Sequence, residues 1–218
     1  MNLEAELAGD HLRLPGTAFL PADSAPGDGT GATTGTATGR VVPAAAVRDA
    51  DPAASPPEIR TVAGETVFVR AERRAELESF CLANRIPRQS RPDVWGALLE
   101  PFLDTEFTPE RQAATQACLS RVAGLSAGEV ADIRARVAPL MRAYNGLHWD
   151  WHHLGLADLL DAATADWIPE HLRIAPGEQA AFYSWAAGIA DLGRNPGATD
   201  ADEGSSARTE PGTEPGVG

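Results

Sequence analysis

Apolar residues recur every three or four positions over most of residues 71–192, and this spacing predicts amphipathic helices. The clearest helix spans 126–144, where Ser126 and Glu129 form a capping box ahead of one apolar stripe. Asn145 and Gly146 are residues that commonly end a helix, so we expect a break there. The same spacing, together with capping residues and prolines, predicts further helices at 71–84, 93–102, 109–123, 148–162 and 176–192.

Residues 59–70 have a different pattern, in which β-branched residues stand on both sides of a turn that contains Gly64. This pattern predicts a small β-hairpin. Because two isolated strands are only marginally stable, the hairpin must pack on helices. We therefore expect a mainly α fold for residues 58–194, a compact bundle of five to six helices with a small N-terminal hairpin.

The two ends of the chain lack this periodicity. Residues 21–57 are rich in Gly, Ala, Thr and Pro, with too few large apolar side chains to offset the entropy of ordering them. Scattered leucines in residues 1–20 leave open a short docking peptide or a frayed terminus. We expect disorder over 1–57, as an arm and linker, and over 195–218, as an acidic tail.

The formal net charge of the 218 residues is −13, of which residues 58–194 contribute −5. Nucleic acids recruit proteins through dense positive charge, so an acidic chain of this kind is not expected to bind them. The sequence has no apolar run near the roughly 20 residues of a membrane span and no basic, apolar start typical of a secretory signal. These features predict a cytoplasmic protein that binds no membrane. Cys81 and Cys118 stand apart and are expected to be reduced thiols.

One cluster suggests a metal site. His148 and His152 are four residues apart in the helix predicted for 148–162, so they would share one face. Two such imidazoles can bind a transition metal, although no inward carboxylates were found to complete the site. If 126–162 were instead one continuous helix, His148 would face inward and His152 outward. We expect no cofactor, with a bound metal as the alternative.

A second cluster is basic. Arg85, Arg88 and Arg91 recur every third residue in a segment punctuated by prolines, and an extended polyproline-like backbone would align them on one edge. Such an edge could bind a phosphate, a carboxylate or an acidic partner. The alternatives are ion pairs with carboxylates of the domain itself, or docking of the chain's own acidic tails.

Aromatic residues gather in the last third of the domain, among them Trp149 and Trp151. Most should be core, but exposed ones would form a binding hot spot. The sequence contains no phosphate-binding loop or nucleophile elbow. We therefore expect a noncatalytic interaction or regulatory module that binds a protein partner or itself through Arg85, Arg88, Arg91, Trp149 and Trp151. The alternative is a metal-binding hydrolase or isomerase that uses His148 and His152.

Overall fold

The computed structural model describes residues 4–14, 40–148, 150 and 152–192. These residues form six α-helices and two three-stranded antiparallel sheets. The strands are β1 (Glu6–Ala8), β2 (His11–Leu14), β3 (Arg40–Pro43), β4 (Val47–Asp51), β5 (Glu58–Thr61) and β6 (Thr66–Phe68). The helices are α1 (Arg74–Asn84), α2 (Val94–Leu99), α3 (Pro109–Ala123), α4 (Ala127–His148), α5 (Leu156–Thr164) and α6 (Gln179–Ala190). Short 3-10 turns are η2 (Ala44–Ala46), η3 (Ala71–Arg73), η4 (Glu100–Phe102), η5 (Glu170–Leu172) and η6 (Pro176–Glu178).

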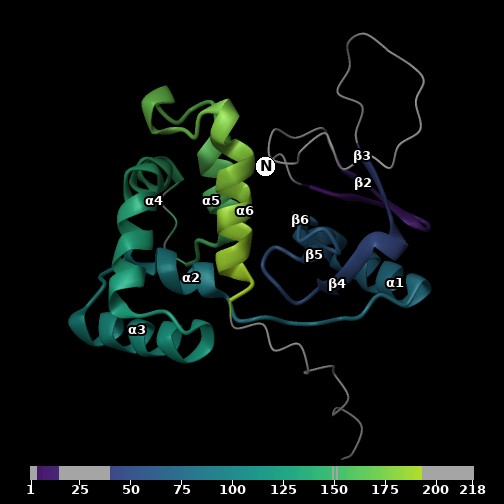
Figure 1. The fold of residues 1–218 in the computed structure, drawn as a ribbon, viewed down its shortest axis with the longest axis horizontal. Helices are drawn as coiled ribbons and strands as arrows, with labels where there is room; N and C mark the ends of the chain where they lie inside the picture. The colour runs from purple at the N-terminus through teal and green to yellow at the C-terminus, as the bar shows by residue number, and fades with distance from the viewer. Residues whose placement is uncertain (1–3, 15–39, 149, 151, 193–218) are drawn as a thin grey trace, which may run out of the picture.

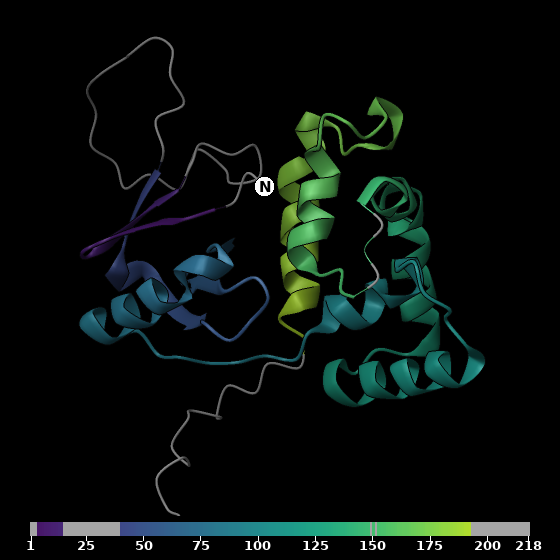
Figure 2. The ribbon, with the colours of Figure 1, turned by 180° about the vertical axis from the view of Figure 1, so that it is seen from behind.

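The elements form two lobes that lie side by side (Figure 1). The β lobe contains all six strands and α1, and the helical lobe contains α2 to α6. Figure 2 shows from behind that the segment between α1 and α2 crosses from one lobe to the other. Each lobe has its own apolar core. The expected mainly α fold is confirmed, but the described residues form two lobes with separate cores and not one compact helical bundle.

The β lobe is built from two sheets, ordered β1-β2-β3 and β4-β5-β6. The backbone N–H of Ala5 donates to the Phe68 carbonyl at 2.8 Å, so the start of the chain runs along β6 and links the two sheets. Alternate side chains of a strand point to one face, which lets short strands fill a core. The buried residues of this core are Ala5, Leu12, Leu14, Val42, Val47, Ala50, Ile59, Val67, Val69, Leu77, Phe80, Cys81 and Ile86.

The helical lobe follows the predicted caps closely. The Asp93 carboxylate accepts from the Gly96 N–H at 2.8 Å and caps α2, and Thr108 caps α3. Ser126 and Glu129 form the expected capping box of α4. The Trp95 indole N–H donates to the Ala186 carbonyl at 2.8 Å and fixes α2 against α6. These caps were predictable because each satisfies backbone groups that a helix end leaves without partners.

The lobes meet where β6 packs on α6. Phe68, at the end of β6, is 2 % exposed and belongs to the core of the helical lobe. The Tyr183 hydroxyl accepts from the Thr66 N–H at 2.6 Å and donates to the Thr66 carbonyl at 2.8 Å. This hydroxyl satisfies both backbone groups of one buried strand residue, so the two lobes are joined by specific polar contacts as well as by apolar packing.

The structure corrects the expected arm over 1–57. Residues 4–14 form β1 and β2, and residues 40–51 form β3 and β4. The predicted 59–70 hairpin exists as β5 and β6, but β4 adds a third strand to it. The average composition of this Gly-rich stretch does not reveal that three of its apolar residues, Val42, Val47 and Ala50, are buried in the core of the β lobe. Residues 15–39 and the tail over 195–218 lie outside the described residues.

The predicted break at Asn145 and Gly146 is also wrong, since α4 continues to His148. The Asn145 side chain does not cap the helix. Its Nδ2 donates to the carbonyls of Phe102 and Asp150, and its Oδ1 accepts from the Asp150 N–H at 2.7 Å. Asn145 thus anchors two neighbouring segments to α4. Within the described ranges, no helix has the length and apolar character that a membrane span requires.

Candidate functional site

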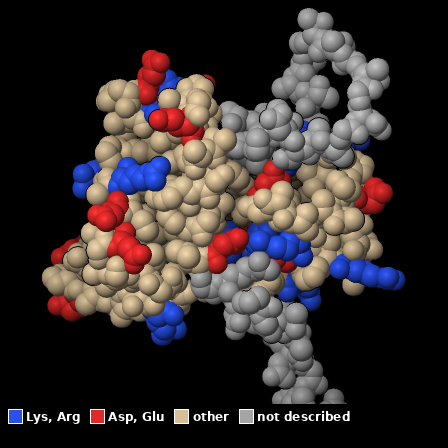
Figure 3. All heavy atoms as spheres, viewed as in Figure 1, with Lys and Arg blue, Asp and Glu red and all other residues tan. Residues whose placement is uncertain are grey.

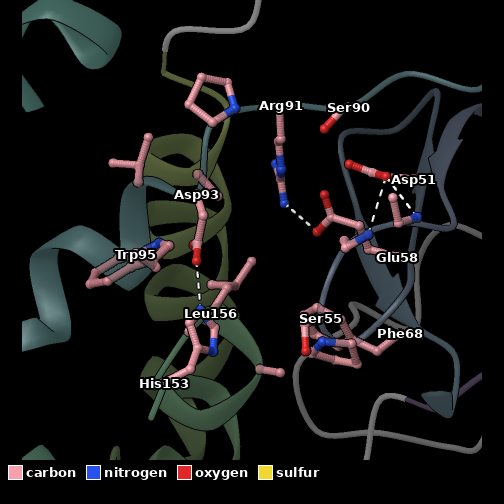
Figure 4. A pocket seen from close by; sticks show the side chains of 18 residues that line it. Asp51, Ser55, Glu58, Phe68, Ser90, Arg91, Asp93, Trp95, His153 and Leu156 are labelled. Atoms are coloured by element: carbon pink, nitrogen blue, oxygen red, sulfur yellow. Dashed lines mark hydrogen bonds and ion pairs between the residues drawn. The ribbon is translucent and has the colours of Figure 1, made fainter. Parts of the chain in front are cut away.

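A pocket of about 160 Å³ lies where the two lobes meet (Figure 4). Its β-lobe wall comes from the end of β4, the start of β5 and the connection between them, with Asp51, Ser55 and Glu58. Its other wall comes from the segment that leads into α2 and from the segment that leads into α5, which supplies His153. We call this the interlobe pocket. It combines carboxylates, hydroxyls, a guanidinium and an imidazole in one small space.

Asp93 and His153 form the pocket's most direct side-chain pair. His153 Nε2 donates to Asp93 Oδ2 at 2.6 Å. The His153 side chain is 40 % exposed and the Asp93 side chain is 55 % exposed. Asp93 Oδ1 meanwhile caps α2. One carboxylate therefore holds the first turn of a helix and orients an imidazole whose other ring nitrogen is left for a further contact.

The environment of this pair favours its charged form. The hydrogen bond that His153 donates to Asp93 raises the pKa of His153; partial burial opposes this rise, and the negative charges of Asp93, Asp158 and Asp150 add to it. Burial opposes ionisation of Asp93, but the hydrogen bonds from His153 and Gly96 outweigh it, so the pKa of Asp93 is lowered. The pair is thus poised as imidazolium and carboxylate over a wider pH range than either group alone.

Two glycines make room for the pair. A Cβ on Gly96 would lie 2.1 Å from Asp93 Oδ2, and one on Gly155 would lie 2.9 Å from His153 Cε1. Both distances are shorter than real Cβ contacts allow. Any larger residue at either position would displace the carboxylate or the imidazole. The contact between Asp93 and His153 therefore also depends on Gly96 and Gly155.

Next to the pocket, six charged residues form a closed ion-pair ring. Its members, in order around the ring, are Arg48, Asp49, Arg60, Glu58, Arg91 and Asp191. The N···O distances are 2.9 Å for Arg48 to Asp49, 2.7 Å for Arg60 to Glu58, 2.7 Å for Arg91 to Glu58, 2.6 Å for Arg91 to Asp191 and 3.4 Å for Arg48 to Asp191. Arg60 also contacts Asp49 directly.

The ring is electrically neutral and spans both lobes. Arg48, Arg60 and their carboxylates belong to β4 and β5, whereas Asp191 follows α6. The Arg60 side chain is only 1 % exposed. A buried guanidinium is tolerated only when it is fully paired, so the ring satisfies each charge with two opposite ones. Loss of one member would leave its neighbours partly unpaired at the lobe interface.

The predicted arginine edge does not form. Residues 87–89 run along β4, where the Ala50 N–H donates to the Pro87 carbonyl at 3.0 Å. In a strand-like segment, side chains three positions apart point to opposite sides. Arg88 accordingly faces solvent, whereas the Arg91 side chain is 6 % exposed and belongs to the ion-pair ring. The alternative of internal ion pairs holds for Arg91.

Arg85 and Arg88 instead lie on a different surface, at the end of α1. Together with neighbouring residues they line an open groove of about 620 Å³, which we call the α1 groove. Its lining residues are Glu78, Ser79, Cys81, Leu82, Arg85, Ile86, Pro87 and Arg88. Neither guanidinium forms an ion pair with the part of the chain that the structure describes, and Leu82 is 83 % exposed. Figure 3 shows that basic and acidic side chains are interspersed on one face of the molecule, with no broad area of one sign.

The spacing of His148 and His152 no longer supports a metal site, because the two residues do not lie in one helix. His148 is the last residue of α4, His152 lies in the following loop, and α5 begins only at Leu156. Gly155 precedes α5, and its N–H donates to the Asp158 carboxylate at 2.8 Å. The two histidines therefore do not share one helical face. No group of three or more potential ligands is arranged for a metal ion within the described residues, and the side chain of His148 and all of Trp149 and Trp151 lie outside them.

Sequence reasoning missed the pairing of Asp93 with His153. In the sequence, Asp93 is the first residue of the helix predicted for 93–102, and His153 lies within the helix predicted for 148–162. The two residues are 60 positions apart, and no local pattern joins them. The only signal was indirect, in the small residues Gly96 and Gly155 that stand close to each partner in sequence. Comparisons of this chain with protein-family models, curated proteins and solved structures found no match.

Proposed function

We propose that this protein is a noncatalytic interaction module whose contact surface is the α1 groove. One observation supports this proposal above the others. A large aliphatic side chain, Leu82, is 83 % exposed beside two arginines that have no ion pair with described residues. Single exposed apolar residues are common on protein surfaces, but this leucine lies in a groove with two available guanidinium groups, and arginine is enriched in binding hot spots.

The backbone at Arg85 supports the same interpretation. Arg85 ends α1 in the left-handed conformation, with φ of 55°, and is the one non-glycine residue with positive φ in the described ranges. Glycine is preferred at this position because a side chain costs about 1 kcal/mol there. An arginine in an unfavourable backbone conformation at the edge of a groove is consistent with a role of its side chain in binding.

The chemistry of the groove indicates the kind of partner. Two guanidinium groups favour carboxylates, which they can bind through paired hydrogen bonds. Leu82 and Ile86 favour an apolar side chain next to those carboxylates. The partner is therefore expected to present a short acidic segment with at least one large apolar residue. A second copy of this chain and the chain's own acidic tail are outcomes that the experiment below distinguishes.

The test compares the wild type with four single-residue variants of the full chain by crosslinking in cell extract, quantitative mass spectrometry and light scattering. Leu82→Ser and Arg88→Glu alter the groove. Val62→Ser and Arg142→Glu are matched controls, because Val62 is 68 % exposed elsewhere and Arg142 is an exposed arginine on α4. We expect one partner to be captured by the wild type and both controls and lost, at least tenfold, from both groove variants.

The alternatives give different results. If the captured species is a second copy, light scattering reports a dimer that the groove variants abolish. If the acidic tail occupies the groove, a protein that ends at residue 192 captures more partner than the full chain. A capture profile that is the same for the groove variants and their controls would show that the α1 groove is not the contact surface.

A further inference from the structure

Asp51 is a charged residue of the interlobe pocket that forms no ion pair with the described residues and uses only one of its two carboxylate oxygens in hydrogen bonds. The residue is 4 % exposed. Its Oδ1 accepts from the N–H of Ala53 at 3.0 Å and from that of Ala54 at 3.2 Å. Its other oxygen, Oδ2, is directed toward the pocket on the side of Ser90 and Arg91, and receives no hydrogen bond from the described residues (Figure 4). This oxygen is accessible from the pocket, so a ligand or solvent can donate a hydrogen bond to it.

The other charged groups of the pocket all form ion pairs, whereas the charge of Asp51 has no partner among the described residues. Glu58 and Arg91 belong to the neutral ion-pair ring. Both Nη atoms of Arg91 are already engaged, one with Glu58 and one with Asp191. His153 and Asp93 form a pair of their own. The net charge of the lining is therefore −1 when His153 is protonated and −2 when it is neutral, and the unbalanced charge is that of Asp51.

The rest of the pocket is mixed in character. Hydroxyl groups come from Ser55 and Ser90, and apolar surface comes from Phe68, Leu156 and Trp95. A ligand that is positively charged at one end and aliphatic at the other would match this lining. An anion would face the unbalanced carboxylate, and a neutral alcohol would leave its charge uncompensated.

We propose that the interlobe pocket binds a small organic ammonium ion, with the ammonium N–H groups donating to Asp51 Oδ2 and the aliphatic part against Phe68 and Leu156. A serine hydroxyl can accept a further N–H from the same ammonium group. The site is separate from the α1 groove, so this proposal stands or falls independently of the proposed function.

The experiment uses the full-length protein and three probes of similar size, namely propylammonium, 1-propanol and propionate. Binding is followed by two-dimensional ¹H–¹⁵N NMR, at the backbone amides of Ala53, Ala54 and Gly155. We expect saturable shifts at these amides with propylammonium, and none with the alcohol or the carboxylate up to the same concentration.

Asp51→Asn is the decisive variant. The asparagine Oδ1 can still accept the two backbone N–H groups, so the turn is preserved while the charge and the free acceptor are removed. We expect it to weaken propylammonium binding by at least about tenfold. Asp132→Asn, an exposed aspartate on α4, is the matched control and should bind as the wild type does.

If Asp51→Asn fails to fold, Ala54→Leu provides a second variant, because it fills the pocket from its partly exposed rim. It should abolish the shifts. Equal shifts with all three probes, or unchanged affinity in Asp51→Asn, would overturn the proposal.

Discussion

At the scale of single residues, the one non-glycine residue with positive φ in the described ranges, Arg85, lies on the surface that we propose for binding. Arg85 ends α1 with positive φ, where its N–H and that of Ile86 close the helix onto the Cys81 and Leu82 carbonyls. Glycine would make the same hydrogen bonds without the steric cost of a Cβ. Stability and binding therefore oppose each other at this position.

Arg85→Gly should raise the free energy of unfolding by about 1 kcal/mol, because it removes the cost of the left-handed conformation. Urea denaturation monitored by circular dichroism measures this change. Arg88→Ala, which replaces an exposed arginine on the same surface without that strain, should change stability by less than about 0.5 kcal/mol. A loss of stability in Arg85→Gly would show that the arginine makes a contact that outweighs its strain.

The Asp93 and His153 pair makes stability depend on pH in a defined direction. The pKa of His153 is raised, so its contribution is complete below the ordinary histidine value near about 6.5 and is lost as pH rises through the folded value. The pKa of Asp93 is lowered, so its contribution is complete above about 4 and is lost as pH falls through the folded value. The pair contributes most between about pH 4 and 6.5.

His153→Gln should therefore destabilise the protein more at pH 5.5 than at pH 9, as measured by urea denaturation at both values. Both side chains are substantially exposed, so the difference is modest. Asp93→Asn provides the reference, because in that background His153→Gln should lose most of its pH dependence. The same destabilisation at both pH values would mean that the pair does not respond to protonation.

At the scale of elements, the start of the short helix α2 depends on the Asp93 side chain that caps it more than on the helix propensity of its residues. It has six residues, and Gly96 lies in its first turn, where alanine would normally be favoured. A Cβ there would meet the carboxylate that caps the helix and holds His153. The glycine is thus required by the pair and not by the backbone.

Gly96→Ala should lower the free energy of unfolding by about 1 kcal/mol, since the loss of the Asp93 cap and of the His153 contact exceeds the gain in propensity. Gly188→Ala, at an exposed position in the last turn of α6 with no atom within 4 Å of the added Cβ, should raise it by about 0.5 to 1 kcal/mol. Thermal and urea unfolding distinguish the two. A stabilising Gly96→Ala would indicate that the carboxylate moves aside at no cost.

The elements also show what a sequence pattern can and cannot predict. The starts of α2, α3 and α4 were predictable, because a helix end places its capping residue within three positions of the backbone group it satisfies. The strands of 3 to 5 residues in the first 51 positions were not, since each has only one or two apolar residues and depends on partners distant in sequence. The segment from Arg85 to Arg91 was expected to repeat every third residue, but residues 87–89 pair with β4, and a strand-like backbone repeats every second residue.

At the scale of the whole molecule, the two lobes are joined by the ion-pair ring, the Tyr183 hydroxyl and the Phe68 side chain. The division into two lobes was not predicted from the sequence, because residues 58–194 contribute to both cores and no local pattern separates them. Both candidate binding sites follow from it. The interlobe pocket exists only where the lobes meet, and Arg91 is absent from the α1 groove because the ring holds it.

Asp191 tests how far the lobes depend on the ring. It pairs with Arg91 at 2.6 Å and with Arg48 at 3.4 Å, and its side chain is 31 % exposed. Asp191→Asn should lower the free energy of unfolding by about 1 to 3 kcal/mol, because two largely buried guanidinium groups each lose a charged partner.

Hydrogen exchange should locate the effect. The Thr66 amide, which donates to the Tyr183 hydroxyl across the interface, should exchange faster in Asp191→Asn, while amides inside α4 keep their rates. Asp166→Asn is the control, because Asp166 pairs with Arg173 at 3.5 Å but is fully exposed, and such surface pairs contribute little. If Asp191→Asn and Asp166→Asn have equal stability and equal exchange at Thr66, then apolar packing of Phe68 and the Tyr183 contacts are sufficient to hold the lobes together.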